Sequence, residues 1–528
     1  MARTSPAAAL LLALALPLAA AAGEDGGGTG LTAAEARGKR LYLTGESASG
    51  VEVLALMGQA GIEVPAAALP CASCHGRDGR GRPEGGVEPS DLTWEALTRP
   101  YEVEIANGRR RGPYTPRLLT RAVAMGLDAS GNELDPLMPR YRLSRDDAAD
   151  LAAYLAKLGK DRDPGVGEAS LTLGVLLPPA EAAGLEGTAR AVRRVLDAYA
   201  GHVNAAGGVY HRRLELRYLP LPPAPEERPA ALARFVEEEG LFALVAPFTA
   251  GADAALAAET ARLGVPSVGP LTLEPDEGFP LNRQVFYLDG GLPAQLRALL
   301  AAAARRAADS EDGAPVAALL HSAGDARLAA LAAGAAAAAG AGFAAVEVRE
   351  LPAPGDPMDA AVAALRAAGA TDLVLLAPGG EAPALLAAAA AAGWSPRVHA
   401  PGALAGPELV AARQGLSLIL SFGSLPADRL PGAVERFRET TGIAAAPGAT
   451  EVAAWTALDL LVAALEDSGR DLSREGLIET LELVRGRPTG LTRPLSFGPN
   501  RRIGVRGAYV VELDAAAEPA SVEWVEAE

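Results

Sequence analysis

The chain is poor in cysteine and in aromatic side chains. Its 528 residues include two cysteines, and Phe, Trp and Tyr together make up 4% of the sequence. It has no Walker loop, no dinucleotide-binding glycine fingerprint and no nucleophile–base motif, so nothing in it indicates an enzyme. Acidic residues outnumber lysine and arginine, and the formal net charge of −17 argues against nucleic acid or an anionic lipid surface as a partner.

Long hydrophobic runs are absent beyond the N-terminus. Over residues 1–22, Arg3 precedes an apolar run of Ala and Leu that ends in Ala20-Ala21-Ala22. This pattern is typical of a secretory signal peptide with a small-residue cleavage site. A retained membrane anchor is the alternative, but the run is short for a bilayer span, which needs about 20 apolar residues. We expect an exported chain without a membrane span once the signal is removed, and a flexible lead-in over residues 23–31.

Both cysteines lie in one string of five residues, Cys71-Ala72-Ser73-Cys74-His75. C-x-x-C-H is the attachment signature of a c-type haem, in which two thiols form thioethers to the porphyrin and the imidazole binds the iron. A zinc site would need more ligands, and the nearest other histidine is His202. A thioredoxin-like dithiol would open a helix after a strand, whereas Pro70 and the run 76–79 indicate a loop. The string predicts one covalent haem, and thiol-linked haem in an exported chain indicates a bacterial periplasm.

Three helices are predicted around the haem loop. Thr32 and Glu35 form a capping-box pattern at the start of the first helix. The second is predicted over residues 116–125, and Ser144 caps the third. Apolar residues follow Ser144 at helical spacing, at Ala148, Leu151, Leu155 and Leu158. Such a small α-domain needs the haem to complete its core.

The second axial ligand of the haem has three methionine candidates. Thioether sulfur raises the potential of a haem, which makes Met the usual partner of His in electron-carrying cytochromes. Met57 lies in an apolar stretch and Met125 on an apolar helix face, so both are assigned to packing. Met138 lies in Leu137-Met138-Pro139, an extended segment that can cross the open haem face. We expect Met138 to be the ligand.

Together these segments resemble the class I cytochrome c family over residues 32–160. The similar segments are Gly38-Lys39-Arg40-Leu41-Tyr42, the haem string with Gly76, Leu137-Met138-Pro139 and Ala152-Ala153-Tyr154-Leu155. The resemblance implies thioether links at Cys71 and Cys74, axial ligation by His75 and Met138, and electron transfer. The chain departs from the family by the insert 47–69. Two roles for this insert are possible from the sequence: it covers a haem edge, or it contacts a partner.

After a polar linker, residues 161–169, strand patterns alternate with helix patterns. Buried strands are predicted at five places, over 171–177, 214–219, 242–245, 316–320 and 373–376. Helices are predicted over 187–203 and 229–238. The alternation indicates an α/β domain with mainly parallel sheets, and residues 170–528 are enough for two lobes with a cleft between them.

The order of motifs in this second part resembles the type I periplasmic binding proteins. The similarity is nearest to the amino-acid and amide receptors of ABC importers, of the Leu/Ile/Val type. It rests on five segments, 202–209, 214–216, 242–248, 264–267 and a closing hairpin made by 496–502 with 509–513. Such receptors close two lobes over a solute. The resemblance implies that Thr249 and Thr272 give hydroxyls, and Ala250 and Leu271 backbone contacts, to a ligand carboxylate; capping of the following helices is the alternative.

Other positions depart from the receptor pattern. Relatives often carry a tyrosine after the second-lobe strand, where this chain has His321-Ser322-Ala323-Gly324-Asp325. Asp325 or Glu381 could meet a ligand ammonium group, although each is more often a solvated loop acid. The histidines other than His75 have no metal-site spacing and are assigned to surface or core, at His202, His211, His321 and His399.

The sequence thus predicts a multidomain periplasmic protein, a small all-α cytochrome c domain followed by a two-lobed α/β solute-binding domain. We expect an electron carrier and binding protein that serves a periplasmic dehydrogenase, another cytochrome or a solute uptake system. The alternative is an ABC-importer binding protein, working with a permease, whose haem senses redox state. A third interpretation is that the binding domain has lost its ligand and docks a partner.

Overall fold

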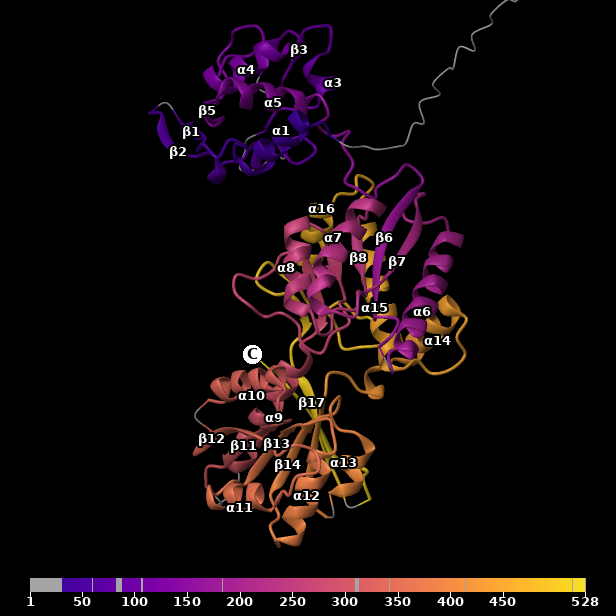
Figure 1. Ribbon diagram of the computed structural model, residues 1–528. Coiled ribbons are helices and arrows are strands. Elements are labelled where there is room, and N and C mark those ends of the chain that lie inside the picture. The colour runs from indigo at the N-terminus through magenta and orange to yellow at the C-terminus, as the bar shows by residue number, and fades with distance from the viewer. Residues whose placement is uncertain are drawn as a thin grey trace, which may run out of the picture. The chain divides into compact units, whose positions relative to one another are not determined.

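The computed structural model describes residues 31–527, apart from Gln59, 82–87, 106–107, Ala183, 309–312, Ala341, Gln414 and Ala515. The expected signal peptide and all but Leu31 of the lead-in lie outside the described residues. The chain divides into two compact units, Met1–Asp161 and Arg162–Glu528 (Figure 1). Among the described helices, none has the length and apolar character to cross a membrane.

The first unit contains the three predicted helices, α1 (Ala33–Thr44), α4 (Pro116–Met125) and α5 (Arg145–Leu155). The predicted caps are confirmed, because Thr32 and Glu35 form a reciprocal capping box and the Ser144 hydroxyl accepts from the Asp147 N–H at 3.0 Å. The expectation of a loop at the haem string is wrong. Cys71–His75 forms one helical turn, α2, and a second short helix, α3, spans Trp94–Leu97.

Helices α1 and α5 cross at close range because Gly38 lies at the contact. A Cβ atom on Gly38 would lie 2.0 Å from the backbone oxygen of Asp150. Beside this point the Arg37 guanidinium donates to both carboxylate oxygens of Asp150, at 2.7 and 2.8 Å. One turn further on, the rings of Tyr42 and Tyr154 lie 5.6 Å apart. At this crossing the first and last helices of the domain come so close together that only glycine fits at position 38.

The insert 47–69 forms a β-hairpin, which the sequence analysis did not predict. Strands β1 (Leu54–Met57) and β2 (Ile62–Pro65) pair antiparallel, and β1 also pairs with β5 (Arg140–Arg142). The single-turn 3₁₀ helix Ala66–Ala68 leads on to α2. A separate two-stranded ribbon joins β3 (Val103–Glu104) to β4 (Arg110–Arg111). The helical domain thus carries two small sheets.

The second unit contains two sheets that form two lobes (Figure 1). The first sheet is entirely parallel and has the order β16-β10-β9-β8-β6-β7. In chain order its strands are β6 (Ser170–Leu177), β7 (Arg213–Pro220), β8 (Ala243–Val245), β9 (Ser267–Val268), β10 (Val285–Asp289) and β16 (Ile503–Val505). The predicted strands over 171–177 and 214–219 are confirmed as β6 and β7.

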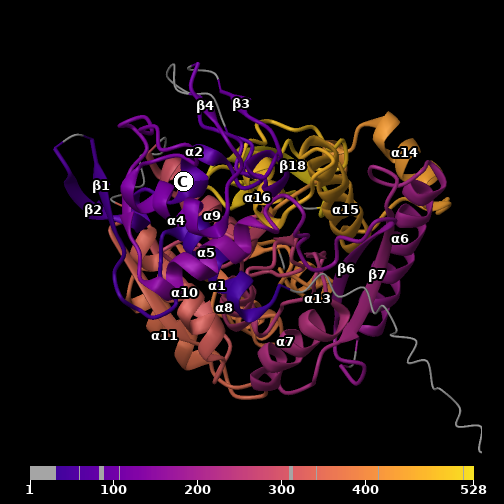
Figure 2. The same ribbon diagram turned by 90° about the horizontal axis from the view of Figure 1, so that it is seen from above.

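Helices cover both faces of the first sheet. They are α6 (Glu186–Ala205), α7 (Arg228–Glu239), α8 (Asp253–Leu263), α14 (Pro431–Thr441), α15 (Ala449–Asp467) and α16 (Arg474–Glu482). Apolar side chains of α6, α14, α15 and α16 build the core on one face, and those of α7 and α8 build it on the other. Helices α6 and α15 pack side by side (Figures 1 and 2). Between them the fully buried Trp455 meets the Tyr199 ring edge-on at 5.6 Å.

The second sheet is parallel except at one edge and has the order β12-β11-β13-β14-β15-β17-β18. Its strands are β11 (Val316–His321), β12 (Ala345–Glu350), β13 (Asp372–Leu376), β14 (Arg397–Pro401), β15 (Leu418–Phe422), β17 (Ala508–Leu513) and β18 (Pro519–Val525). Its helices are α9 (Gly291–Ala308), α10 (Ala326–Ala338), α11 (Asp359–Ala367), α12 (Glu381–Ala391) and α13 (Pro407–Ala412). The predicted strands over 316–320 and 373–376 are confirmed.

The chain passes between the two lobes three times. It leaves the first sheet after β10, returns after β15, and leaves again between β16 and β17. The expected closing hairpin is therefore wrong in detail. Residues 498–501 form a tight turn that leads into β16 of the first sheet, whereas residues 509–513 lie in β17 and pair with β18. Because β10 ends where the chain leaves for α9, the loops after the parallel strands β8 and β9 lie at the edge that faces the second lobe.

A buried polar network joins the starts of β13 and β14. The carboxylate of Asp372, 1% exposed, accepts from the Arg397 guanidinium at 2.9 and 2.8 Å and from the Thr371 hydroxyl at 2.8 Å. His399 Nε2 lies 2.8 Å from the same carboxylate. Although burial alone raises its pKa, these hydrogen bonds with His399 and Arg397 hold the pKa of Asp372 well below its usual range.

Replacing Asp372 by asparagine is expected to destabilise the second lobe by about 3 kcal/mol at neutral pH, because the half-buried Arg397 guanidinium is left without the anion that it contacts. The folded pKa is depressed, so the stabilisation is present above the unfolded aspartate pKa of about 3.9 and disappears as the pH falls through the folded value. Urea unfolding at neutral and at acid pH checks this, with Asp325→Asn as a surface control. A wild-type advantage that did not shrink in acid would contradict the assignment.

Candidate functional site

The haem string forms one turn of helix, α2, on which Cys71 is partly buried and Cys74 is exposed. Burial raises the pKa of the Cys71 thiol to about 12. A reactive C-x-x-C dithiol instead has a depressed thiol pKa. The raised pKa of Cys71 differs from that pattern.

The imidazole of His75 is held in one orientation. The residue is 7% exposed, and Nδ1 lies 2.9 Å from the backbone oxygen of Ser90. With Nδ1 donating to this carbonyl, the lone pair of Nε2 is left for a metal, which is the usual way in which a ligating histidine is oriented. Burial also lowers the pKa of His75, which favours the neutral ring that a metal requires. The residues present fit the group that the C-x-x-C-H string implies.

The three candidate methionines differ in exposure. The assignment of two of them to packing is wrong, because Met57 at the end of β1 is 39% exposed and Met125 at the end of α4 is 66% exposed. Met138 is half-buried, and Pro139 next to it is buried. Burial thus distinguishes Met138 from the other two candidates. Helix periodicity had predicted that the Met125 side chain is buried, whereas the structure exposes it.

The segment that contains Met138 is anchored on both sides. Before it, the Arg140 guanidinium donates to the carbonyl of Leu134 at 3.1 Å and to that of Met138. After it, β5 pairs with β1 of the insert, and the Tyr141 hydroxyl donates to the Leu69 carbonyl at 2.6 Å, two residues before Cys71. The insert therefore links the methionine segment to the residues directly before α2.

Tyr42 fixes the end of α2 that follows His75. The sequence had indicated this residue only as part of the segment 38–42, without a role of its own. Tyr42 is fully buried on α1, and its hydroxyl donates to the carbonyl of Gly76 at 2.6 Å. A buried tyrosine hydroxyl needs a hydrogen-bond partner, and here that partner is the residue directly after His75. Helix α1 thus sets the position of the haem string.

In the second unit, the loops after β8 and β9 lie against each other. The Leu271 N–H donates to the Pro247 carbonyl at 2.8 Å, and the Thr249 N–H donates to the Leu271 carbonyl at 3.3 Å. The Leu292 N–H, in the first turn of α9, donates to the Leu273 carbonyl at 2.7 Å. The structure therefore brings Thr249, Ala250, Leu271 and Thr272 to one place, at the edge of the first lobe that faces the second.

The hydroxyls of the two threonines already have partners within the chain. Thr249, 8% exposed, donates to the carboxylate of Asp253 at 2.8 Å, and the Gly251 N–H donates to the same carboxylate at 3.1 Å. The Thr272 hydroxyl accepts from the Glu274 N–H at 2.8 Å. Asp253, the first residue of α8, was not identified from the sequence.

The two acids expected to meet an ammonium group have different surroundings. Asp325 caps α10, where its carboxylate accepts from the N–H groups of Arg327 and Leu328 at 3.0 Å. The expectation of a solvated acid is wrong for Glu381, which is 5% exposed at the start of α12. Its Oε2 is buried and has no hydrogen-bond partner among the described residues. The two histidines of the second lobe, His321 and His399, are both buried.

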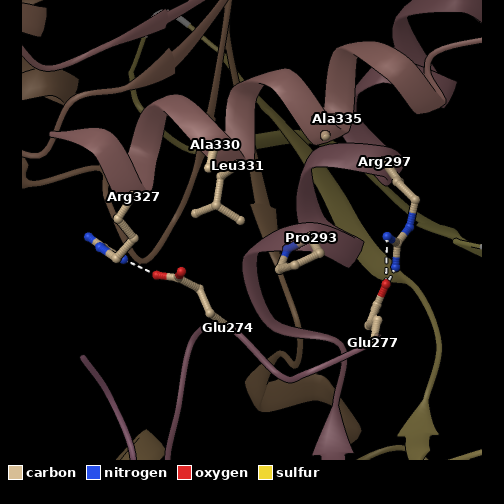
Figure 3. A pocket seen from close by; sticks show the side chains of 9 residues that line it. Glu274, Glu277, Pro293, Arg297, Arg327, Ala330, Leu331 and Ala335 are labelled. Carbon is tan, nitrogen blue, oxygen red and sulfur yellow. Dashed lines mark hydrogen bonds and ion pairs between the residues drawn. The ribbon is translucent and has the colours of Figure 1, made fainter. Parts of the chain in front are cut away.

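A hollow of about 400 Å³ lies where the segment after β9 meets α9 and α10 (Figure 3). Two ion pairs flank it, because Glu274 contacts Arg327 of α10 and Glu277 contacts Arg297 of α9 with oxygen–nitrogen distances of 2.9 and 2.8 Å. The side chain of Leu331 points into the space between them (Figure 3). These pairs join the two lobes beside Thr272. Over the described residues, no group of three or more His, Cys, Asp or Glu side chains is arranged to hold a metal ion.

The fold and the order of these loops define a two-lobed binding protein, and a cytochrome c domain precedes it in the sequence. The family model described as "Periplasmic binding protein" matches residues 170–518, and the chain belongs to that family. The cytochrome c model matches residues 64–159, a domain type that implies haem c. A comparison with curated proteins finds no match.

Solved structures share the fold of the second unit. A fatty acid ABC transporter substrate-binding protein from Thermomonospora curvata has a TM-score of 0.50 and 20% identity, over 69% of this chain and 93% of that one. LivJ from Streptococcus pneumoniae, in complex with isoleucine, has a TM-score of 0.51 and 17% identity, over 68% and 99%. A branched-chain amino acid ABC transporter protein from Thermus thermophilus with bound valine has a TM-score of 0.51 and 15% identity, over 68% and 97%.

Proposed function

We propose that this protein is a periplasmic electron carrier with one covalent haem c, joined to a receptor domain for a small solute. Cys71 and Cys74 carry the thioethers, and His75 and Met138 bind the iron. When bound, the haem supplies one-electron transfer between Fe(II) and Fe(III). The observation that carries the proposal is the setting of His75, which is buried, fixed through Nδ1 by Ser90 and preceded on the same helical turn by Cys71 and Cys74.

The chain supports this role by holding the iron ligands rigidly. Tyr42 fixes the position of α2, and Tyr141 links the methionine segment to Leu69. Electron transfer is fast when the ligands move little between the two iron states, and a buried, hydrogen-bonded setting restricts that movement. The redox partner belongs to the periplasm, as a dehydrogenase or another cytochrome. The receptor domain recognises a small molecule through the loops that contain Thr249, Ala250, Leu271 and Thr272.

Native mass spectrometry of the protein from a haem-maturing periplasm, repeated after unfolding, tests both halves of the proposal. We expect the unfolded mass to exceed that of the mature polypeptide by one haem, and the excess to vanish in the Cys71→Ala, Cys74→Ala double variant. An unfolded wild-type mass without haem would sink the electron-carrier role. A small molecule present natively and lost on unfolding would identify the solute of the receptor domain.

A second candidate function is delivery of a solute to an ABC permease, with the haem as a redox sensor. The two-lobed fold favours this second function. Two lobes joined by three passages of the chain and by ion pairs can close over a ligand by a hinge movement. Coupling requires that solute affinity differ between the oxidised and reduced forms. Titration of the solute found by mass spectrometry against both forms distinguishes the candidates, because a simple carrier gives equal affinities.

A further inference from the structure

Part of the insert 47–69 belongs to the core of the cytochrome domain. Val53 and Ala55 are buried, and both lie in the same apolar cluster as Tyr141. Cys71 of α2 packs against that cluster. The hairpin is therefore joined to the core beside the haem string and does not stand apart from the domain as a surface loop would.

Strand β5 depends on the insert for its pairing. The small sheet has the order β2-β1-β5 (Figure 1), so β5 lies at its edge, and β1 is the one described strand that pairs with β5. Ala55 of β1 lies opposite Tyr141. Strand β5 begins with Arg140, two residues after Met138. The backbone that follows the methionine is thus held by hydrogen bonds to the insert.

The hydrogen bonds on the two sides of Met138 differ in their reach along the chain. On the near side the bond is local, since the Met138 N–H donates to the Asp135 carbonyl at 3.0 Å. After the methionine, the hydroxyl of the buried Tyr141 donates to the Leu69 carbonyl at 2.6 Å, across 72 positions of the chain. Leu69 is the last residue of the insert, and α2 begins two residues later. The insert therefore supplies a long-range anchor for the segment 135–139.

A segment that is anchored only locally samples conformations in which its side chains withdraw from their partners, and a long-range anchor removes many of these conformations. For an iron ligand, the withdrawn population decides how readily another ligand binds. The apparent affinity of a competing ligand is its intrinsic affinity multiplied by the fraction of molecules in which the position is vacant. A contact that restrains the segment therefore protects the metal position without touching the metal.

We propose that the insert is a clamp, formed by the β1–β5 pairing and the Tyr141–Leu69 hydrogen bond, that holds Met138 in place against competing iron ligands. Tyr141 is the positioning residue of this clamp. The inference rests on the proposed ligation by Met138. It gives the insert a role that needs neither a partner protein nor a covered haem edge.

Titration of the oxidised full-length haem protein with imidazole tests the clamp. Imidazole is a good ligand for iron, and its replacement of a thioether sulfur changes the visible spectrum. Tyr141→Phe keeps the buried ring and removes only the hydroxyl that donates to Leu69. We expect imidazole to bind the variant about fivefold more tightly than the wild type, the factor that one hydrogen bond represents. The rate of binding at saturating imidazole, which reports how often the position opens, is expected to rise as well.

Thr32→Ala is the matched control. It removes the capping box of α1, a loss of stability similar to that of one hydrogen bond, and the Thr32 hydroxyl accepts from the Glu35 N–H of the same helix. Its imidazole affinity is expected to stay within about twofold of the wild type, because the effects of distant sites are nearly independent. Tyr141→Ala, which also removes the ring from the core, is expected to show a larger gain than Tyr141→Phe. If the alanine variant does not fold, the phenylalanine variant decides the test alone.

The outcomes separate the clamp from the ligand assignment. Tighter imidazole binding in the Tyr141 variants with little change in Thr32→Ala supports the clamp. Equal affinities in wild type and Tyr141→Phe overturn it, and so does an equal gain in Thr32→Ala, which would trace the effect to a general loss of stability. Failure of the proposed ligand has a different signature. A Met138→Ala variant with the visible spectrum and the potential of the wild type contradicts the ligand assignment, and the clamp with it, whatever imidazole does in the Tyr141 variants.

Discussion

Replacing Met138 by alanine is expected to lower the haem reduction potential by on the order of 100 mV while leaving the haem attached. The thioether sulfur favours the reduced iron, so its loss stabilises Fe(III). The proposed thioethers at Cys71 and Cys74 do not involve the methionine. A spectroelectrochemical titration of wild type and variant measures the shift directly, and haem that stays with the unfolded chain shows that attachment is intact.

Met125→Ala is the matched control for this experiment. Met125 ends α4, and its side chain is 66% exposed. It is therefore expected to leave the potential unchanged within experimental error. A large shift at Met125 together with none at Met138 would reverse the ligand assignment.

Gly38→Ala is expected to destabilise the cytochrome domain by about 3 kcal/mol. The added Cβ would lie 2.0 Å from the Asp150 oxygen and 2.8 Å from the Cβ atom of Tyr154. The first of these is a backbone atom that cannot turn aside, so α1 and α5 must move apart. Urea unfolding followed by haem absorbance reports on this domain and gives the change in the free energy of unfolding.

Gly201→Ala gives the opposite expectation from the same substitution. Gly201 lies inside α6, and a Cβ atom there would have nothing within 4 Å. Removing the flexibility of a helix-interior glycine stabilises by roughly 0.5–1 kcal/mol. Far-UV circular dichroism during urea unfolding follows this second unit. If both variants changed stability in the same direction, the close crossing of α1 and α5 would not be the cause of the effect at Gly38.

Sequence patterns predicted the local elements of both units well. The capping box at Thr32, the cap at Ser144 and the buried strand over 171–177 depend on residues close together in the chain, and the structure has all three. The C-x-x-C-H string needs five consecutive residues, and the structure brings its histidine to a buried carbonyl partner. Local chemistry of this kind is visible without a fold.

Features that depend on residues far apart were missed or misjudged. The insert forms a hairpin because β1 finds its second partner in β5, more than 80 positions later in the numbering. Helix periodicity predicted that Met125 lies in the core. Met125 is the last residue of α4, however, and its side chain is exposed. Asp253 has no motif of its own. The loops after β8 and β9 lie together through a bridge between Phe248 and Leu271 that appears only in the folded chain.

The three passages of the chain between the lobes have a consequence for biosynthesis. Strand β16, at the edge of the first sheet, is supplied by Ile503–Val505, and β17 and β18 complete the second sheet from residues still later in the chain. Neither sheet can be completed until nearly the whole polypeptide has been made. The first unit ends at Asp161, so the cytochrome c domain can fold while the rest of the chain is still being made. A chain cut short before residue 500 would therefore yield a folded cytochrome c domain attached to a two-lobed domain that cannot form.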